Sequence, residues 1–343
     1  MLKFERALAL PAPQINKEGT MHRQTVLILA ALAFPSSFAA HAQHGYPSRP
    51  VRMVVTVPPG GAADFVARIM AQKLGDALGQ TVVVDNRAGG GGQIAAEIVA
   101  KAAPDGYTLL LGSITTHGIG PHIYSKLPYD PVKNYAPICL YATMPMLMVI
   151  NAQVPAKSVA EVIALAKAKP GSISFASSGS GGAPHLVGEL FKTATGAPIQ
   201  HVPYKGSAPG AADVAGGQVQ LMFDALTPQQ PHIKSGRTRV LAAISPARLA
   251  AFPDVPTMAE LGYPRVAASI WYGLMAPAGT PQEIITKLNA ESNRILATQD
   301  VKERMAATGI DAAGGTPEAF GKFIHDEIAK WGPVVKAAGA KAD

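Results

Sequence analysis

The hydrophobic residues follow two patterns along the chain, short apolar runs typical of strands and the three- and four-residue spacing typical of helices. Residues 51–57 form a mostly apolar, β-branched run, as expected for a strand buried on both faces. Residues 58–61 (PPGG) end this run, and the apolar positions of residues 65–70 recur at helical spacing. Asp64 lies where this helix is expected to begin and is a candidate for its N-cap.

The glycine-rich turn at residues 58–61 gives this strand–turn–helix unit a chemical property. A helix that follows such a turn has backbone N–H groups without intrahelical partners at its positively polarised N-terminus. These groups form a ready site for an anion, so the turn is a candidate ligand-binding loop.

The same pattern recurs along most of the chain, and it predicts an α/β fold in which mostly parallel sheets are flanked by helices. After the first unit, strands are expected at residues 81–84, 108–111, 146–150, 173–176, 200–202, 219–223, 240–244 and 270–275. Helices are expected from residue 93, at 158–169 with a capping box formed by Ser158 and Glu161, from near 184, and at 208–215, 281–298 and 317–337.

Two α/β units of similar pattern, joined by extended strands near residues 146–150 and 270–275, predict a two-lobed protein with a double crossover. We expect one lobe to comprise residues 43–147 and 265–343, and the other to comprise residues 148–264. Folds of this kind bind ligands in a cleft beyond the carboxyl ends of the strands.

Five predicted strand ends carry glycine or small polar residues that would point toward such a cleft. Their backbone N–H groups and hydroxyls could bind a carboxylate without a dedicated arginine. A single glycine-rich loop is usually only a tight turn, but the repetition favours a binding site. The candidate ligand-binding residues are Pro59, Gly60, Gly61, Asp64, Gly91, Gly92, Ser113, Thr115, Thr116, His117, Ser177, Ser178, Gly179, Ser180, His185, Tyr204, Lys205, Gly206, Asp224 and Trp271.

Several of these side chains have an ordinary structural explanation beside the functional one. Asp64 suits a helix N-cap at least as well as a ligand contact, and His117 and His185 suit hydrogen bonding within their loops. Asp224 follows a strand, where it could accept hydrogen bonds from loop N–H groups or from an amine or hydroxyl of a ligand. Trp271 suits stacking on a ligand and core packing equally.

The N-terminal region has the pattern of a secretory signal peptide. A short basic start at residues 21–23 precedes the apolar run at 26–34, which is too short to span a bilayer, and residues 40–42 (AHA) form a cleavage signal. We expect cleavage after Ala42 and a periplasmic mature protein, with residues 1–20 a misassigned upstream start. A membrane anchor retained in the mature protein is the less favoured alternative.

Composition narrows the function classes further. The chain has 343 residues, of which 48% are hydrophobic and 15% charged, which argues against disorder. The net charge of +7 comes from scattered basic residues without interleaved aromatics, so a nucleic-acid partner is not expected. The single cysteine, Cys139, forms neither a disulfide nor a zinc site and is expected in the core.

Enzymatic and cofactor motifs are largely absent from the sequence. Ser180 lacks the first glycine of a G-x-S-x-G elbow, and neither H-E-x-x-H nor a Walker A lysine motif occurs. Residues 90–95 (GGGQIA) fit a dinucleotide fingerprint, but the next strand ends without the acidic residue that would bind a ribose. We therefore expect no catalytic activity, no cofactor and no metal.

Long motifs of the sequence resemble the Bug family, the periplasmic solute-binding proteins of tripartite tricarboxylate transporters. They include PPGGAADFVARIM, VVVDNRAGGGGQIAAEIVAKAAPDGYTLLLGSITTH, LPYDPVKNYAPICL, SSGSGGAPHLVGELF, VPYKGSAP and FPDVPTMAELGYP, and the match covers nearly all of the chain after residue 46. The resemblance implies a two-lobed periplasmic-binding-protein fold of type II that closes on a small organic anion. It also implies delivery to a permease with one large and one small membrane subunit.

The resemblance also implies which loops hold the ligand. Pro59, Gly60, Gly61 and the loop at residues 177–182 would grip a carboxylate, partly through waters, and residues 112–117, 204–207 and Asp224 would map to the same cleft.

The favoured hypothesis is a monomeric periplasmic binding protein for a small carboxylate. Two alternatives are a ligand-loaded sensor for a membrane kinase and an exported hydrolase using Ser180 with His185. The sequence is compatible with a dicarboxylate, a citrate-like acid, an amino acid or an aromatic acid as the ligand.

Overall fold

The computed structural model describes residues 45–342, and the chain from Tyr46 onward forms one compact unit. The expected signal peptide and its cleavage position after Ala42 lie outside the described residues. Among residues 45–342, the helices are too short or too polar for any of them to cross a membrane.

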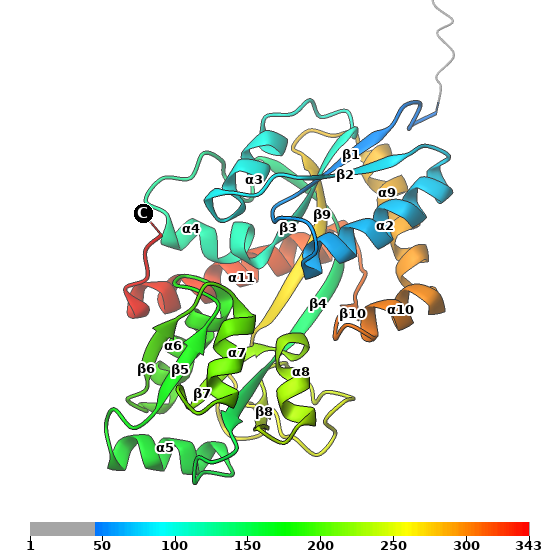
Figure 1. Cartoon of the computed structure of the whole chain (residues 1–343). Helices are drawn as coiled ribbons and strands as arrows, with labels where there is room; N and C mark the ends of the chain where they lie inside the picture. The colour runs from blue at the N-terminus through cyan, green and yellow to red at the C-terminus, as the bar shows by residue number, and fades with distance from the viewer. Residues whose placement is uncertain (1–44, 343) are drawn as a thin grey trace, which may run out of the picture. The chain divides into compact units, whose positions relative to one another are not determined.

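Strands and helices alternate through most of this unit, as the sequence pattern predicts (Figure 1). The strands are β1 (Val51–Val55), β2 (Val82–Asn86), β3 (Thr108–Ser113), β4 (Tyr135–Asn151), β5 (Ser174–Ser177), β6 (Gln200–Pro203), β7 (Leu221–Ala225), β8 (Thr238–Ala243), β9 (Ser269–Pro277) and β10 (Asp311–Ala312). The helices are α2 (Ala62–Leu78), α3 (Gln93–Ala100), α4 (Gly120–Ile123), α5 (Val159–Ala168), α6 (Ala183–Thr195), α7 (Ser207–Ala215), α8 (Leu226–Lys234), α9 (Gln282–Leu296), α10 (Gln299–Ala306) and α11 (Pro317–Ala338).

The strands pair in the order β2-β1-β3-β9-β4-β7-β5-β6, with β8 and β10 also paired to β4. The first strand group, β2-β1-β3, is parallel, and so is the second strand group, β6-β5-β7, in agreement with the predicted parallel sheets. All pairings of β4 and β9 are antiparallel, so the sheet as a whole is mixed.

Strand β4 connects the two strand groups. Its first part pairs with β9 as far as Pro145, and its last part, from Met146, pairs with β7 and β8. The sequence predicts only residues 146–150 as a strand, because prolines at positions 137 and 145 interrupt the apolar pattern. In the structure both prolines lie within the paired strand, and Figure 1 shows β4 running from one strand group toward the other.

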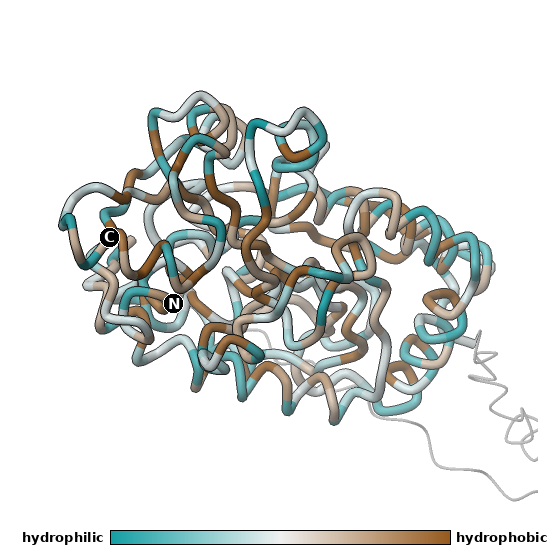
Figure 2. Tube along the Cα trace, turned by 90° about the horizontal axis from the view of Figure 1, so that it is seen from below, coloured by the Kyte–Doolittle hydropathy of each residue, from teal (hydrophilic) through white to brown (hydrophobic). Residues whose placement is uncertain are grey.

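Both faces of the first strand group are buried, as its continuous apolar runs predict. Met53 and Val55 lie in one hydrophobic cluster with residues of α2 and α9, whereas Val54 lies in another with residues of α3 and α11. This two-residue alternation places helices on both sides of the strands. Figure 2 shows hydrophobic segments in the interior of the trace and alternating hydrophobic and hydrophilic positions along the outer helical coils.

The start of α2 corrects one expectation. The N-cap is Gly61 in an extended conformation, so the helix begins at Ala62 and Asp64 lies inside its first turn. From that position the Asp64 carboxylate accepts the Gly60 N–H at 3.0 Å instead of capping the helix N-terminus from outside. The predicted capping at α5 is confirmed, because the Ser158 hydroxyl accepts the Glu161 N–H at 3.2 Å.

The sequence pattern does not predict three of the helices, namely the short α4, and α8 and α10, which follow β7 and α9. Pro228 and Pro231 lie inside the α8 sequence and hide its helical character. Cys139 is buried as expected, and burial raises the pKa of its thiol to about 12.

Strand β9 packs closely against α11, so a larger side chain at this contact should lower the stability of the protein. A Cβ atom added to Gly273 would lie 2.1 Å from Cζ of Phe320, a buried ring of α11. We expect Gly273→Ala to lower the free energy of unfolding by roughly 1–3 kcal/mol, because the ring must move within a packed core. Urea unfolding measures the change.

The matched control is Gly321→Ala, one residue along α11, whose new Cβ would lie 3.5 Å from Cγ of Pro137, an ordinary contact. That variant should be neutral or more stable, since alanine exceeds glycine in helix propensity by about 1 kcal/mol. Equal stabilities of the two variants would contradict the packing described here.

Candidate functional site

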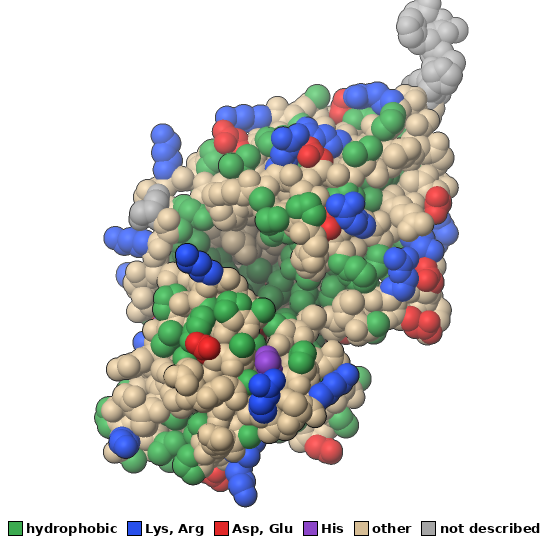
Figure 3. Space-filling view, viewed as in Figure 1, with side chains coloured by type: hydrophobic (Ala, Val, Ile, Leu, Met, Phe, Trp, Pro, Cys, Tyr) green, Lys and Arg blue, Asp and Glu red, His purple; other side chains and the backbone are tan. Residues whose placement is uncertain are grey.

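A cavity of about 670 Å³ lies where the segments after β1, β6 and β7 meet the middle of β4 and β9. Figure 3 shows a hollow lined largely by hydrophobic side chains on the face where the two strand groups meet. The residues that line the cavity are Gly60, Gly61, Ala62, Phe65, Met144, Ser207, Ala208, Asp224, Ala225, Thr227, Pro228, Ile270, Tyr272, Thr308 and Ile310.

Three helix N-termini contribute to this lining. Gly61 and Ala62 begin α2, Ser207 begins α7, and Ala225 is the N-cap of α8. The first N–H groups of each helix have no intrahelical partner and carry partial positive charge. The described residues that line the cavity include no Lys, Arg or His, so any partial positive charge in the lining comes from the backbone.

The loop before α2 is held by Asp64. One oxygen of this buried carboxylate accepts hydrogen bonds from Gly60 N and Arg68 Nε, at 3.0 and 2.9 Å, and the other accepts Asn86 Nδ2 at 3.0 Å. Burial raises the pKa of Asp64, but the hydrogen bonds from Arg68, Gly60 and Asn86 outweigh it and lower the pKa below its ordinary value. Gly60 has φ +93°, which favours glycine. Asp64 thus orients this loop and does not line the cavity.

Asp224 is the one acidic residue of the lining, at the end of β7. Its side chain is nearly fully buried, and Oδ1 accepts the Ala225 N–H at 2.8 Å. Oδ2 makes no hydrogen bond of normal geometry with any residue that the structure describes. Burial raises the pKa of Asp224 to about 6, against the lowering effect of Ser207, Ala225 and Gln229.

The predicted loop after β5 forms a second cluster with the loop after β6. The N–H groups of Tyr204 and Gly206 donate to the carbonyls of Ser177 and Ser178, at 3.0 and 3.1 Å. Neither loop places Ser178, Gly179, Ser180 or Gly206 in the cavity lining, which starts at the adjacent Ser207. Lys205 is exposed, and Pro59 is exposed next to Gly60.

A pair of histidines supports the loop after β5. His185 Nδ1 accepts the Gly181 N–H at 3.0 Å, and His201 Nε2 lies 2.6 Å from Ser177 Oγ. The two rings stack with centroids 3.8 Å apart. Burial lowers the pKa of His185, and burial together with His185 lowers the pKa of His201 to about 4, so both rings are neutral near pH 7. His185 thus positions a loop and does not line the cavity.

The predicted residues after β2 and β3 pack against each other outside the cavity. Both segments are short helical turns, at Gly90–Gly92 and Thr115–Ile119, where the sequence predicts loops. A Cβ atom on Gly92 would lie 2.8 Å from Thr116 Cγ2, so the two turns approach closely. The Thr116 hydroxyl accepts a hydrogen bond from the Ser113 N–H at 3.2 Å and lies 2.9 Å from His117 Nδ1. His117 is fully buried, and burial lowers its pKa to about 3. Gly91 and Thr115 likewise do not line the cavity.

Trp271 is fully buried in the core, where its indole N–H donates to Glu327 Oε2 at 3.1 Å. Its neighbours Ile270 and Tyr272 line the cavity. The alternation of side chains along β9 places them on the face opposite Trp271, a signal already present in the sequence. Ile310 lies beyond α10, a helix that the sequence pattern does not predict, and no local signal identifies it.

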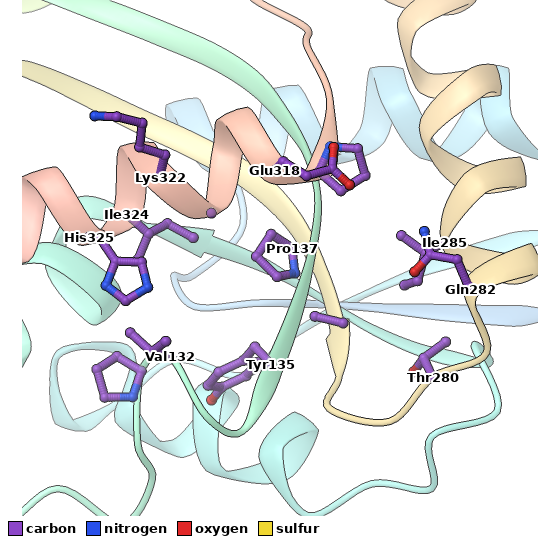
Figure 4. A pocket seen from close by; sticks show the side chains of 14 residues that line it. Val132, Tyr135, Pro137, Thr280, Gln282, Ile285, Glu318, Lys322, Ile324 and His325 are labelled. Carbon is purple, nitrogen blue, oxygen red and sulfur yellow. The ribbon is translucent and has the colours of Figure 1, made fainter.

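A second cavity of about 480 Å³ lies between the start of β4 and the helices α9 and α11 (Figure 4). It contains none of the predicted site residues. Glu318, which lines it, lies in the first turn of α11 and places a carboxylate at that helix N-terminus. Within residues 45–342, no group of three or more His, Cys, Asp or Glu side chains is arranged to hold a metal ion.

Comparisons with known proteins agree with this architecture. The family model for the tripartite tricarboxylate transporter family receptor matches residues 66–340. Protein BugT of Bordetella pertussis is 43% identical over 297 residues, which cover 86% of this chain and 91% of that protein.

Two solved structures with bound ligands are also similar. An R. palustris protein with adipate is 37% identical, with a TM-score of 0.75, covering 87% of this chain and 99% of that one. MatC from Rhodopseudomonas palustris with bound malate is 33% identical, with a TM-score of 0.71, covering 84% of this chain and 100% of that one. The resemblance inferred from the sequence motifs is confirmed.

The raised pKa of Asp224 predicts a pH-dependent cost in stability. Its pKa is about 6 in the folded protein against an ordinary 3.8, so between these values the folded state holds more protons than the unfolded state, and stability falls as pH rises. We expect Asp224→Asn to raise the free energy of unfolding at about pH 8 by on the order of 2–3 kcal/mol. The gain should disappear near pH 4. Urea unfolding of the ligand-free protein at both pH values measures it, and a gain independent of pH would contradict the assignment.

Proposed function

The chain belongs to the tripartite tricarboxylate transporter receptor family, and from that premise we propose that it captures a small organic carboxylate in the 670 Å³ cavity. Members of this family are periplasmic solute receptors without enzymatic activity. The bound solute would pass to a permease with one large and one small membrane subunit. An N-terminal signal peptide cleaved after Ala42 would direct export.

The observation that carries the proposal is the convergence of the N-termini of α2 and α7 on a cavity whose described lining residues include no Lys, Arg or His. Backbone N–H groups at such ends give hydrogen bonds to a carboxylate that are worth roughly 1.5–3 kcal/mol each. The start of α2 is the best placed, because Gly61 and Ala62 line the cavity and Asp64 already holds the preceding Gly60.

The ligands of two solved relatives support a carboxylate as the ligand class. One holds adipate, which has only its two carboxylates as polar groups, and the other holds malate, which also has a hydroxyl. Because the carboxylate is the feature that the two ligands share, we propose a small carboxylate as the ligand class of this chain.

Binding would be coupled to closure of two lobes, residues 43–147 with 265–343 and residues 148–264. In support, lining residues come from both strand groups: Gly61 follows β1, whereas Asp224 belongs to β7. A ligand that contacts both sides stabilises the closed state by its difference in affinity for the two states. The Ser177–Gly182 loop would reach the ligand only in that closed state.

A thermal-shift screen of residues 43–343 against organic acids tests the proposal. A ligand at 100 times its dissociation constant adds roughly 2.7 kcal/mol of stability and raises the unfolding midpoint measurably. We expect a raised midpoint with at least one small carboxylate and no chemical conversion of it. If no carboxylate shifts the midpoint of protein refolded free of carried-over ligand, the proposal is wrong.

Charge at the start of α2 gives the site-specific prediction. Gly61 has open space for a side chain, so Gly61→Asp adds a carboxylate next to the proposed anion site without a steric clash. We expect calorimetry to show carboxylate affinity reduced at least tenfold, corresponding to the loss of about one charge-assisted hydrogen bond. Gly61→Asn, similar in size but neutral, should bind nearly normally. Equal affinities of the two variants would remove this loop from the site.

A further inference from the structure

The two ends of the cavity differ in charge. At the start of α2, the cavity is lined by Gly61 and Ala62, whose N–H groups are the unpartnered donors of a helix N-terminus. At the start of α8, Asp224 already occupies the corresponding position, since its Oδ1 accepts the N–H of the N-cap Ala225. A ligand carboxylate is therefore favoured at the α2 end and opposed at the Asp224 end.

The two carboxylate oxygens of Asp224 are not equally satisfied. The side chain is 2% exposed, Oδ1 accepts the Ala225 N–H, and the side chains of Ser207 and Gln229 lower its pKa. Oδ2, however, has no hydrogen bond of normal geometry to any described residue, and the Gln229 amide donates to the sulfur of Met222 at 3.2 Å. A buried carboxylate oxygen without a donor is costly, which indicates that a donor arrives from the ligand.

The space between the two ends is largely apolar. Phe65, Met144, Ile270 and Ile310 contribute hydrocarbon or aromatic side chains to the lining. A matching ligand has a carboxylate at one end, a hydrocarbon segment, and a second polar group that reaches Asp224.

We propose that this second group is a hydrogen-bond donor, an ammonium or a hydroxyl, and that Asp224 is the residue that selects for it. The cavity would then prefer amino or hydroxy carboxylates to plain dicarboxylates of the same length. A second ligand carboxylate beside Asp224 would bring two like charges together in a site that excludes water, whereas a donor satisfies Oδ2. This inference rests on the proposed function, because it assumes that the α2 end binds a carboxylate.

Matched ligand pairs test the inference by titration calorimetry of the mature protein at about pH 8, where Asp224 is ionised. The pairs are adipate with ε-aminocaproate and succinate with γ-aminobutyrate, and in each pair an ammonium replaces one of the two carboxylates. In at least one of these sets, the donor-bearing ligand should bind about tenfold or more tightly than the plain dicarboxylate.

Asp224→Asn shows whether Asp224 causes the preference. Asparagine keeps the shape, removes the charge and adds an N–H donor, so the preference for the ammonium ligand should fall at least tenfold. The control is Asp326→Asn on α11, where Asp326 is exposed, forms an ion pair with Lys322 and does not line the cavity, so every affinity should stay unchanged. Each variant replaces one carboxylate with an amide: the carboxylate is buried in Asp224→Asn and exposed in Asp326→Asn.

The outcomes separate the inference from the proposed function. If the plain dicarboxylates bind as tightly as their donor-bearing partners, or if Asp224→Asn leaves the preference intact, the inference is wrong and the carboxylate receptor stands. If none of these ligands and no other carboxylate binds, the proposed function fails and the inference fails with it.

Discussion

The backbone pairing of one strand, β4, holds the two halves of the fold together. Its first part forms hydrogen bonds with β9, and its last part forms them with β7 and β8. A buried strand must satisfy its N–H and C=O groups along both edges, so the position of β4 constrains the strands on either side. As a result, the loop after β1 and the end of β7 line the same cavity although they are far apart in the sequence.

Within that cavity, the charge balance depends on backbone dipoles rather than on basic side chains. The starts of α2, α7 and α8 supply partial positive charge, and Asp224 supplies the opposing negative charge. A lysine or arginine would bind a carboxylate through a flexible side chain whose ordering costs entropy, whereas helix N–H groups are already held in place. Burial raises the pKa of Asp224, so the ionised form of this side chain is disfavoured in the folded protein.

Much of the secondary structure and the identity of the family could be predicted from the sequence, because local patterns are sufficient for both. The alternating runs identify nearly every parallel strand, and the Ser158 cap is confirmed by its hydrogen bond to Glu161. The local sequence pattern does not predict α8 or the first half of β4, because prolines interrupt the pattern in both elements. Tertiary contacts nevertheless stabilise both elements. The same local pattern predicts Asp64 as the N-cap of α2, whereas Asp64 lies within the first turn of that helix.

The candidate site also depends partly on local sequence and partly on long-range packing. Residue types and spacing by themselves determined that a glycine-rich turn precedes a helix at Gly61 and that Asp224 lies at a strand end. In α/β folds, ligands generally bind beyond the carboxyl ends of strands. Only the tertiary structure decided which strand ends share a cavity, because that depends on the pairing of β4 with strands distant in sequence. It places His117 and Trp271 in the core and brings Phe65, Tyr272 and Ile310 to the cavity. The physical reason is that a side chain's environment is set by long-range packing, about which local sequence carries little information.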